Sequence, residues 1–258
     1  MTNNIVGSID LVEFIFTLFW LFFAVLVLYL HRESKREGYP LEAPHRMGEV
    51  VVRGFPSEPK KKTFKTRFHG EISVPRKDPE HELAARYVGD FPGAPIEPTG
   101  DPLVDGIGPA AWSDRADTPD LTLHGKPRIV PMRNHAEFGI DERDADPRGM
   151  SVIAADGEKV GTVTDNWIDI PEPGIVYIEI ALDASIGSGN VLMPFAFVDK
   201  IDKAGGALHS NALLSDQYGR VPRLKDADTI TLLEEEKVMG YFGGGKLLAE
   251  PSRAEPLI

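Results

Sequence analysis

The chain has 258 residues, contains no cysteine and carries a formal net charge of −12 at pH 7. The absence of cysteine excludes a disulfide framework, a thiolate nucleophile, an iron–sulfur cluster and a cysteine-based zinc site. The charge is uneven: residues 31–70 hold ten Lys and Arg against five Glu, whereas the residues after 70 carry −15. Because nucleic-acid binding needs clustered cations, this acidic bulk argues against a nucleic-acid partner.

Residues 11–30, LVEFIFTLFWLFFAVLVLYL, predict a transmembrane helix. The run from Phe14 to Leu30 carries no charge, and 20 helical residues rise about 30 Å, the thickness of the hydrocarbon core. A cleaved signal peptide would need a cationic start and a small-residue cleavage site, and the sequence around this run has neither. We therefore expect a membrane anchor.

Cations flank the anchor on one side only. Arg32, Lys35 and Arg36 follow the span and no Lys or Arg precedes it. The positive-inside rule then predicts a periplasmic segment at residues 1–10 and a cytoplasmic C-terminal side.

Residues 31–110 predict an extended segment, because 11 of the 21 prolines fall here and proline excludes long helices and central strands. A free linker and a strap lying on another protein are both compatible with this composition. Small apolar clusters favour the strap, since burial of such side chains offsets the ordering entropy. These clusters are Val50–Val52, Phe55, Phe64, Phe68, Ile72–Val74 and Tyr87–Val88. The basic run KKKTFKTR at 60–67 is typical of a solvated charged segment, and beside an anchor lipid headgroups are its more plausible contact.

Residues 111–258 predict a globular domain of short strands. A hairpin is expected over Val152–Ala155 and Val160–Val163, with Asp156-Gly157 forming a primed-type turn. Further strands are expected at 167–170, 175–182, 191–198 and 207–214, with Glu179 on a polar face. This spacing indicates a small closed or partly closed β-barrel.

A helix is predicted near residues 232–242. Thr231 and Glu234 have the spacing of a capping box at its start, and Gly243 to Gly245 are expected to end it. The fold class is therefore one N-terminal transmembrane helix, a mainly-β cytoplasmic domain and a short C-terminal helix.

The sequence holds no nucleophile, phosphate-loop, zinc-protease or dinucleotide motif, and no local metal-ligand spacing. Three titratable residues remain of interest: His124 in a predicted surface loop, Asp169 at a strand end, and Glu172 between two prolines. Carboxylates and imidazole are the parts of a proton relay. An exposed histidine and ordinary turn carboxylates are the alternative, and the sequence does not show that the three adjoin.

Six segments in order resemble the H subunit of the purple-bacterial photosynthetic reaction centre, and the likeness covers essentially the full chain. They are REGYPLE (36–42), GDPLVDGIGPAAW (100–112), KPRIVPM (126–132), DPRGM (146–150), GTVTDNWIDIPE (161–172) and LLEEEKVMGYFGGGKL (232–247).

The resemblance implies a non-catalytic subunit with a PRC-barrel domain in the bacterial inner (intracytoplasmic or chromatophore) membrane. Such a subunit caps the cytoplasmic face of the L and M subunits, stabilises the quinone sites and assists proton transfer to the secondary quinone. It binds no cofactor or metal itself. The L and M subunits hold bacteriochlorophyll, bacteriopheophytin, quinones, non-haem iron and carotenoid. A cytochrome subunit and light-harvesting antenna are further candidate partners.

The resemblance also assigns residues. Glu172 matches an interior carboxylate near the secondary-quinone pocket, with Asp169 beside it, and His124 matches a surface histidine at the proton entrance. Tyr29, Arg32 and Lys35 stand where a lipid headgroup would be contacted.

The sequence departs from the family pattern at three positions near these residues. Lys126 stands where the family can have a second histidine and Thr122 where it can have an acid, which implies a reduced or relocated proton entrance. Val176 replaces a basic residue that can lie near the interior carboxylate, which leaves the charge state of Glu172 open. The alternative to the whole interpretation is a membrane-tethered β-barrel interaction module with no photosynthetic role. A tethered enzyme has no motif behind it.

Overall fold

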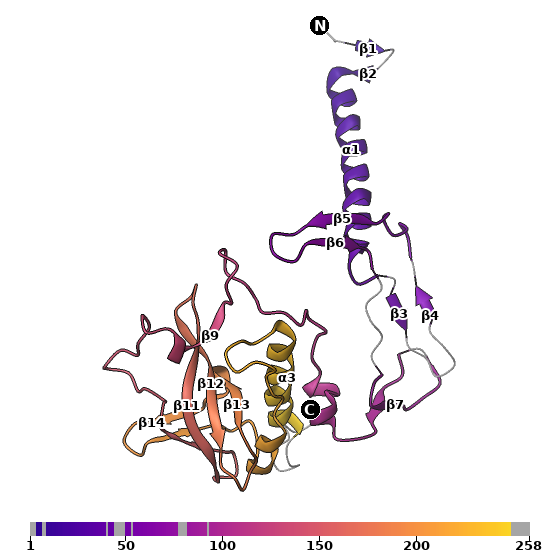
Figure 1. Ribbon diagram of the computed structural model, residues 1–258. Helices are drawn as coiled ribbons and strands as arrows, with labels where there is room; N and C mark the ends of the chain where they lie inside the picture. The colour runs from indigo at the N-terminus through magenta and orange to yellow at the C-terminus, as the bar shows by residue number, and fades with distance from the viewer. Residues whose placement is uncertain are drawn as a thin grey trace. The chain divides into compact units, whose positions relative to one another are not determined.

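The computed structural model describes residues 4–6, 9–39, 41–43, 50–52, 54–76, 82–91 and 93–248. The chain forms two compact units (Figure 1). The first comprises Met1–Glu82 and Tyr87–Glu97, and the second comprises Leu83–Arg86 and Pro98–Ile258.

The first unit contains a long apolar helix, α1 (Leu11–Glu33), which follows the short strands β1 (Asn4–Val6) and β2 (Ile9–Asp10). Asp10 caps α1, since its carboxylate accepts a hydrogen bond of 2.9 Å from the Glu13 amide. A 3₁₀ turn, η1 (Ser34–Arg36), continues the chain. Among the described residues, α1 with its continuation is the one helix long and apolar enough to cross a membrane, and none of its most apolar stretch is buried within the chain. The predicted helix is confirmed and extends three residues further than expected.

After η1 the first unit holds short antiparallel pairs. Strand β3 (Leu41–Ala43) pairs with β4 (Val50–Val52), and β5 (Lys62–Lys65) pairs with β6 (Glu71–Val74). Strands β7 (Ala85–Tyr87) and β8 (Ile96–Pro98) lie where the chain passes between the units. No helix of the described residues between 37 and 101 interrupts this extended chain, as the proline content predicts.

The second unit is built on a seven-stranded sheet. Its strands are β9 (Ile129–Pro131), β10 (Ser151–Ile153), β11 (Lys159–Asp169), β12 (Gly174–Leu182), β13 (Asn190–Pro194), β14 (Lys200–Asp202) and β15 (Ala207–His209). The order is β13-β12-β11-β10-β15-β14, and β9 pairs with the C-terminal half of β11. All pairings are antiparallel except β10 with β15. The main hydrophobic core of this unit includes Trp167, Tyr177, Tyr218 and Phe242, which are fully buried.

Three strand predictions differ from the structure. Residues 167–170 do not form a separate strand, because register shifts let β11 continue from Lys159 to Asp169. The strand predicted over 191–198 ends at Pro194, which has no N–H for the ladder, and the 3₁₀ turn η4 (Phe195–Phe197) follows. The strand predicted over 207–214 ends at His209, after which the Ser210 amide donates to the Ile153 carbonyl.

The C-terminal helix α3 (Leu232–Leu248) begins as predicted but does not stop at its glycines. Thr231 and Glu234 make both hydrogen bonds of the capping box, at 2.9 and 3.2 Å. The glycines lie inside the helix, and Gly244 packs closely on the 3₁₀ turn η2 (Gly108–Ala110), which follows the short helix α2 (Pro102–Asp105). A Cβ on Gly244 would lie 2.5 Å from the Ala110 Cβ. Glycine at this position serves close packing and not helix termination.

Candidate functional site

Asp169 and Glu172 lie together at the turn between β11 and β12. Asp169 ends β11 and is 8% exposed, and its Oδ1 accepts a hydrogen bond of 3.3 Å from the Glu172 amide. Arg128, just before β9, joins the two carboxylates: its Nη2 lies 2.7 Å from Asp169 Oδ2 and 3.3 Å from Glu172 Oε1. Asp169 raises the pKa of Arg128 above its ordinary value through this hydrogen bond. The Glu172 side chain is 81% exposed, so its carboxylate faces away from the domain core.

His124 belongs to a neighbouring turn of the same unit. The turn is closed by a bridge between Leu121 and Pro127, and the imidazole is exposed. His124 lines a cavity of about 380 Å³ together with Ile170 and Pro171 of the β11–β12 turn. Thr122 and Lys126, two of the departures from the family pattern, line the same cavity. The structure therefore brings the histidine turn against the turn that carries Glu172.

The three residues expected near lipid differ in exposure. Tyr29 and Arg32 are exposed on α1. Lys35 is 2% exposed, its Nζ donates a hydrogen bond of 2.7 Å to the Pro56 carbonyl, and it lies 5.1 Å from the centre of the Tyr39 ring. A headgroup role for Lys35 stays a prediction that this geometry does not favour.

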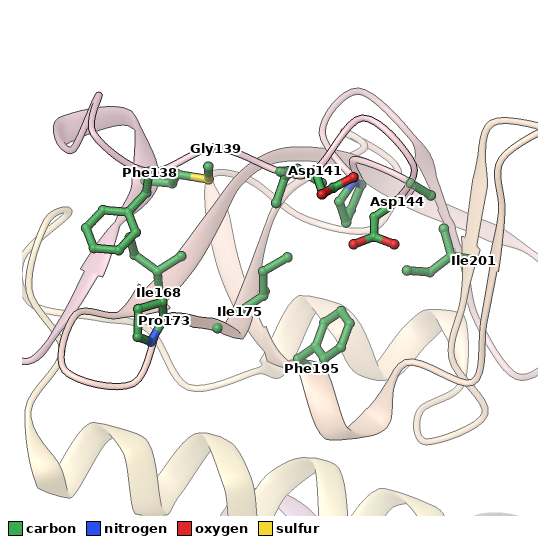
Figure 2. A pocket seen from close by; sticks show the side chains of 14 residues that line it. Phe138, Gly139, Asp141, Asp144, Ile168, Pro173, Ile175, Phe195 and Ile201 are labelled. Atoms are coloured by element: carbon green, nitrogen blue, oxygen red, sulfur yellow. The ribbon is translucent and has the colours of Figure 1, made fainter.

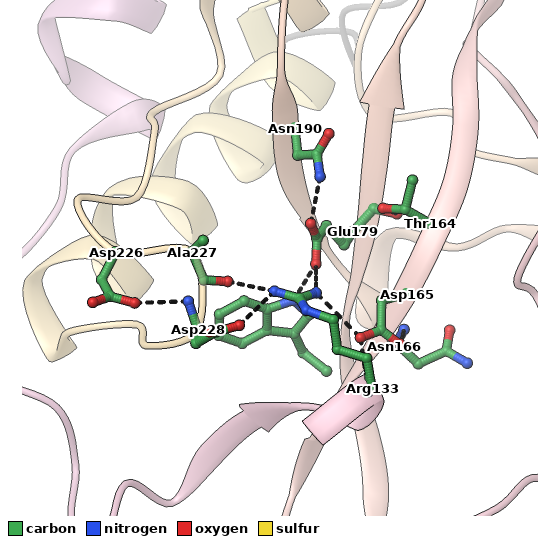
Figure 3. Close-up of polar contacts among 10 residues, drawn as sticks. Arg133, Thr164, Asp165, Asn166, Glu179, Asn190, Asp226, Ala227 and Asp228 are labelled. Atoms are coloured by element: carbon green, nitrogen blue, oxygen red, sulfur yellow. Dashed lines mark hydrogen bonds and ion pairs between the residues drawn. The ribbon is translucent and has the colours of Figure 1, made fainter. Parts of the chain in front are cut away.

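A second polar cluster surrounds Arg133, and Figure 3 shows it between β11, β12 and the loop at 226–228. Arg133 Nη1 lies 3.2 Å from Asp165 Oδ2 and 2.5 Å from Glu179 Oε2, and Nη2 lies 2.8 Å from Asp228 Oδ1. Glu179 also accepts hydrogen bonds from Trp167 Nε1 at 2.9 Å and from Asn190 Nδ2 at 2.5 Å.

The Arg133 cluster corrects the expectation for Glu179. This residue is 6% exposed and does not lie on a polar face. Burial acts to lower the pKa of Arg133, but its bonds with Glu179 and Asp228 outweigh burial and hold that pKa above its ordinary value. Buried carboxylates need such partners, since an unpaired buried charge is costly. The cluster therefore connects the 3₁₀ turn η3 (Met132–Asn134) with β11, β12 and the 226–228 loop through hydrogen bonds and ion pairs.

Sequence reasoning missed both arginines. Arg128 is 41 positions from Asp169, and Arg133 is 46 positions from Glu179. The available signal was Glu179 itself, one charge in the apolar strand IVYIEIAL, which needs a cation from elsewhere in the fold.

A second cavity, of about 450 Å³, also lies beside the β11–β12 turn (Figure 2). Its lining includes Phe138, Ile168, Ile175 and Phe195, with Asp144 among the few acids. Pro173, next to Glu172, also lines it. The turn that carries Glu172 thus has apolar hollows beside it at both Pro171 and Pro173. Within the described part of the chain, no group of three or more acidic and histidine side chains is placed to hold a metal ion.

Comparison with known families accounts for both parts of the chain. Residues 3–134 match the photosynthetic reaction centre H-chain N-terminal region, and this match covers just over half of the chain. Residues 140–211 match the PRC-barrel domain and include β10 to β15 of the sheet. The apolar N-terminal helix, the mainly-β domain and the C-terminal helix agree with the predicted fold class. The chain therefore belongs to the H-subunit family of the photosynthetic reaction centre, whose members are membrane-anchored, non-catalytic accessory subunits.

Proposed function

We propose that this H subunit caps the cytoplasmic face of the L and M subunits, stabilises their quinone sites and conducts protons from the cytoplasm toward the secondary quinone. The orientation follows the charge asymmetry around α1, with residues 1–10 periplasmic and the C-terminal domain cytoplasmic. In this role the pigments, quinones and non-haem iron belong to L and M, and antenna or cytochrome subunits are further neighbours.

The strap supports the capping role. Several of its large apolar side chains have little cover within the chain: Phe55 is 82% exposed, and Leu83, Val88 and Phe91 are each more than half exposed. A free linker would gain nothing from these side chains, whereas contact with a protein surface would bury them. The interpretation as a tethered module without a photosynthetic role does not account for a family match over half of the chain.

The Asp169–Arg128–Glu172 cluster carries the proposal for proton transfer. A doubly reduced quinone inside protein must collect protons across low-dielectric material, where an unpaired charge is expensive. Glu172 offers an outward-facing carboxylate, and Arg128 connects it to the less exposed Asp169. His124 lines a cavity beside the same turn, and imidazole exchanges protons near neutral pH. The proposed proton route therefore starts at His124 and continues through Glu172.

The test is Glu172→Gln in the assembled complex. Flash-induced transfer of the second electron to the secondary quinone should slow by about ten-fold or more, as expected when a proton-transfer group is removed. Primary charge separation should not change. Glu158→Gln is the matched control, because Glu158 is an exposed carboxylate in the turn between β10 and β11. Wild-type kinetics for Glu172→Gln at every pH would exclude the proposed role of Glu172.

A further inference from the structure

The hairpin of β5 and β6 concentrates positive charge in an acidic protein. Residues 60–71 contain five cations and one carboxylate, whereas the whole chain carries −12. The cations are Lys60, Lys61, Lys62, Lys65 and Arg67, all on exposed positions. The ion pair that Lys65 makes with Glu71, at 3.7 Å, is open to solvent on both sides. Such a pair contributes little stability, so the hairpin does not neutralise itself.

The strand register separates the hairpin into two faces. Phe64 lies opposite Ile72, and Lys62 opposite Val74, which gives one mainly apolar face. The other face is polar, and there the Thr63 and Ser73 hydroxyls form a hydrogen bond of 2.6 Å.

Aromatic rings with cations beside them remain exposed on this hairpin. Phe64 and Phe68 are each 41% exposed. Lys62 Nζ lies 5.0 Å from the centre of the Phe64 ring, and Arg67 Cζ lies 5.2 Å from that of Phe68. Aromatic and cationic side chains in alternation suit the boundary between water and a bilayer, where rings enter the interface and cations meet headgroups.

Hydrogen bonds attach both ends of the hairpin to the end of the membrane helix. Arg36 Nη1 donates to the Lys60 carbonyl at 2.8 Å and to the Val74 carbonyl at 3.4 Å. Glu33, the last residue of α1, holds this guanidinium through two hydrogen bonds of 2.7 and 2.9 Å. Figure 1 shows the two strands projecting sideways at the C-terminal end of α1. The position of the hairpin is therefore set by the helix.

This attachment places the hairpin near the lipid headgroups. The uncharged run ends at Leu30, and six further residues to Arg36 advance the chain by about 10 Å along the axis. A headgroup layer is about 5–8 Å thick, and the Debye length at physiological salt is about 8 Å. Long lysine and arginine side chains at this height reach the headgroups.

We infer that the β5–β6 hairpin is a membrane-surface binding element that recognises anionic lipid headgroups. Its cations contact the lipid phosphates, and the rings of Phe64 and Phe68 contact the interface. The attraction to an anionic leaflet grows with the number of cations near its surface. An acidic protein surface is the competing partner, but the attachment to the end of α1 favours the bilayer. The inference needs α1 to span the membrane and does not depend on proton transfer.

The absence of cysteine allows a site-specific test with the full chain. His69→Cys, in the turn of the hairpin, would carry a fluorophore in lipid nanodiscs of neutral phosphatidylcholine or of phosphatidylcholine with phosphatidylglycerol. The same amount of headgroup spin-labelled phosphatidylcholine quenches the fluorophore in both. We expect about two-fold stronger quenching in the anionic discs at low salt, and loss of that difference in about 1 M salt.

Two triple variants with the same change in charge make the test specific. Lys61→Gln, Lys62→Gln and Lys65→Gln together should lower quenching in anionic discs to the level of neutral discs. Lys159→Gln, Lys200→Gln and Lys203→Gln, three exposed positions of the barrel domain, should leave it unchanged. Far-UV circular dichroism checks that each variant is folded.

Equal quenching in neutral and anionic discs would overturn the inference, as would equal effects of the two triple variants. The same label in the assembled complex distinguishes binding of the hairpin to lipid from binding to a protein partner. Quenching in the complex that no longer depends on lipid charge, together with failure of the hairpin triple variant to copurify with the other subunits, would show that the hairpin binds protein. The inference would then be wrong.

Discussion

Two adjacent glycines of α3 should respond in opposite directions to the same substitution. In Gly244→Ala the new Cβ would meet the Ala110 Cβ at 2.5 Å, its Cα at 2.7 Å and its amide nitrogen at 3.0 Å. These are backbone and near-backbone atoms that cannot rotate away, so α3 must move from η2. Overpacking of this kind costs about 1–3 kcal/mol.

The gain in helix propensity reduces this cost at position 244, and at position 243 it makes the same substitution stabilising. Alanine is about 1 kcal/mol better than glycine inside a helix. Gly244→Ala should therefore lose up to about 2 kcal/mol of unfolding free energy. In Gly243→Ala the Cβ meets only the Phe197 Cζ, at 3.9 Å, which is an ordinary contact. That variant should gain about 0.5–1 kcal/mol.

Urea unfolding of the full chain in detergent would measure both variants. Fluorescence reports the transition, because Trp167 is fully buried in the domain that α3 covers. A difference of about 2 kcal/mol between the variants corresponds to about 4–8 °C in Tm for a domain of this size. If both substitutions shift the midpoint the same way, close packing is not the reason that glycine occupies position 244.

Two further predictions concern buried charge. Arg133→Met should lower the free energy of unfolding by about 3 kcal/mol, because it leaves Asp165 and Glu179 buried without their cation. Adding Glu179→Gln should recover part of this loss. In the same urea titration, Arg143→Met at an exposed ion pair should change the free energy of unfolding by less than about 1 kcal/mol. Burial raises the pKa of Glu235, and the hydrogen bond from Tyr177 offsets this only in part. The folded chain therefore holds the Glu235 proton more tightly than the unfolded chain, in which the pKa of this carboxyl is near 4.5. The free energy of unfolding falls as pH rises from that pKa to the higher pKa of the folded chain. Glu235→Gln should remove this slope, so its stability relative to wild type should increase between acidic and neutral pH; parallel curves would contradict the assignment.

Local patterns were sufficient for the elements that depend on local chemistry. The uncharged run after Glu13 predicted α1, and the Thr231–Glu234 spacing predicted the start of α3. The position of the turn at Asp156-Gly157 was also predicted, and Gly157 has the positive φ of 85° that favours glycine. The predicted primed type is wrong, because such a turn needs a positive φ at Asp156 and no described residue other than glycine has one. In each case the physical cause lies within a few residues of its effect.

Long-range packing decided the elements that the sequence did not predict. The end of α3 depends on Ala110, more than 130 positions from Gly244, and the burial of Glu179 depends on Arg133. In the candidate site, the acids Asp169 and Glu172 could be named from their motif. Their cation, Arg128, could not, because only the pairing of β9 with β11 brings it to them.

The packing of α3 on η2 also bears on how the subunit is made. Translation delivers α1 first and α3 last, and domains fold as their segments emerge. The surface around Ala110 and Ala212 that receives the α3 glycines stays uncovered until α3 itself has been synthesised. The core of the second unit is therefore completed only after α3 has been made, long after the residues of α1 are available for insertion.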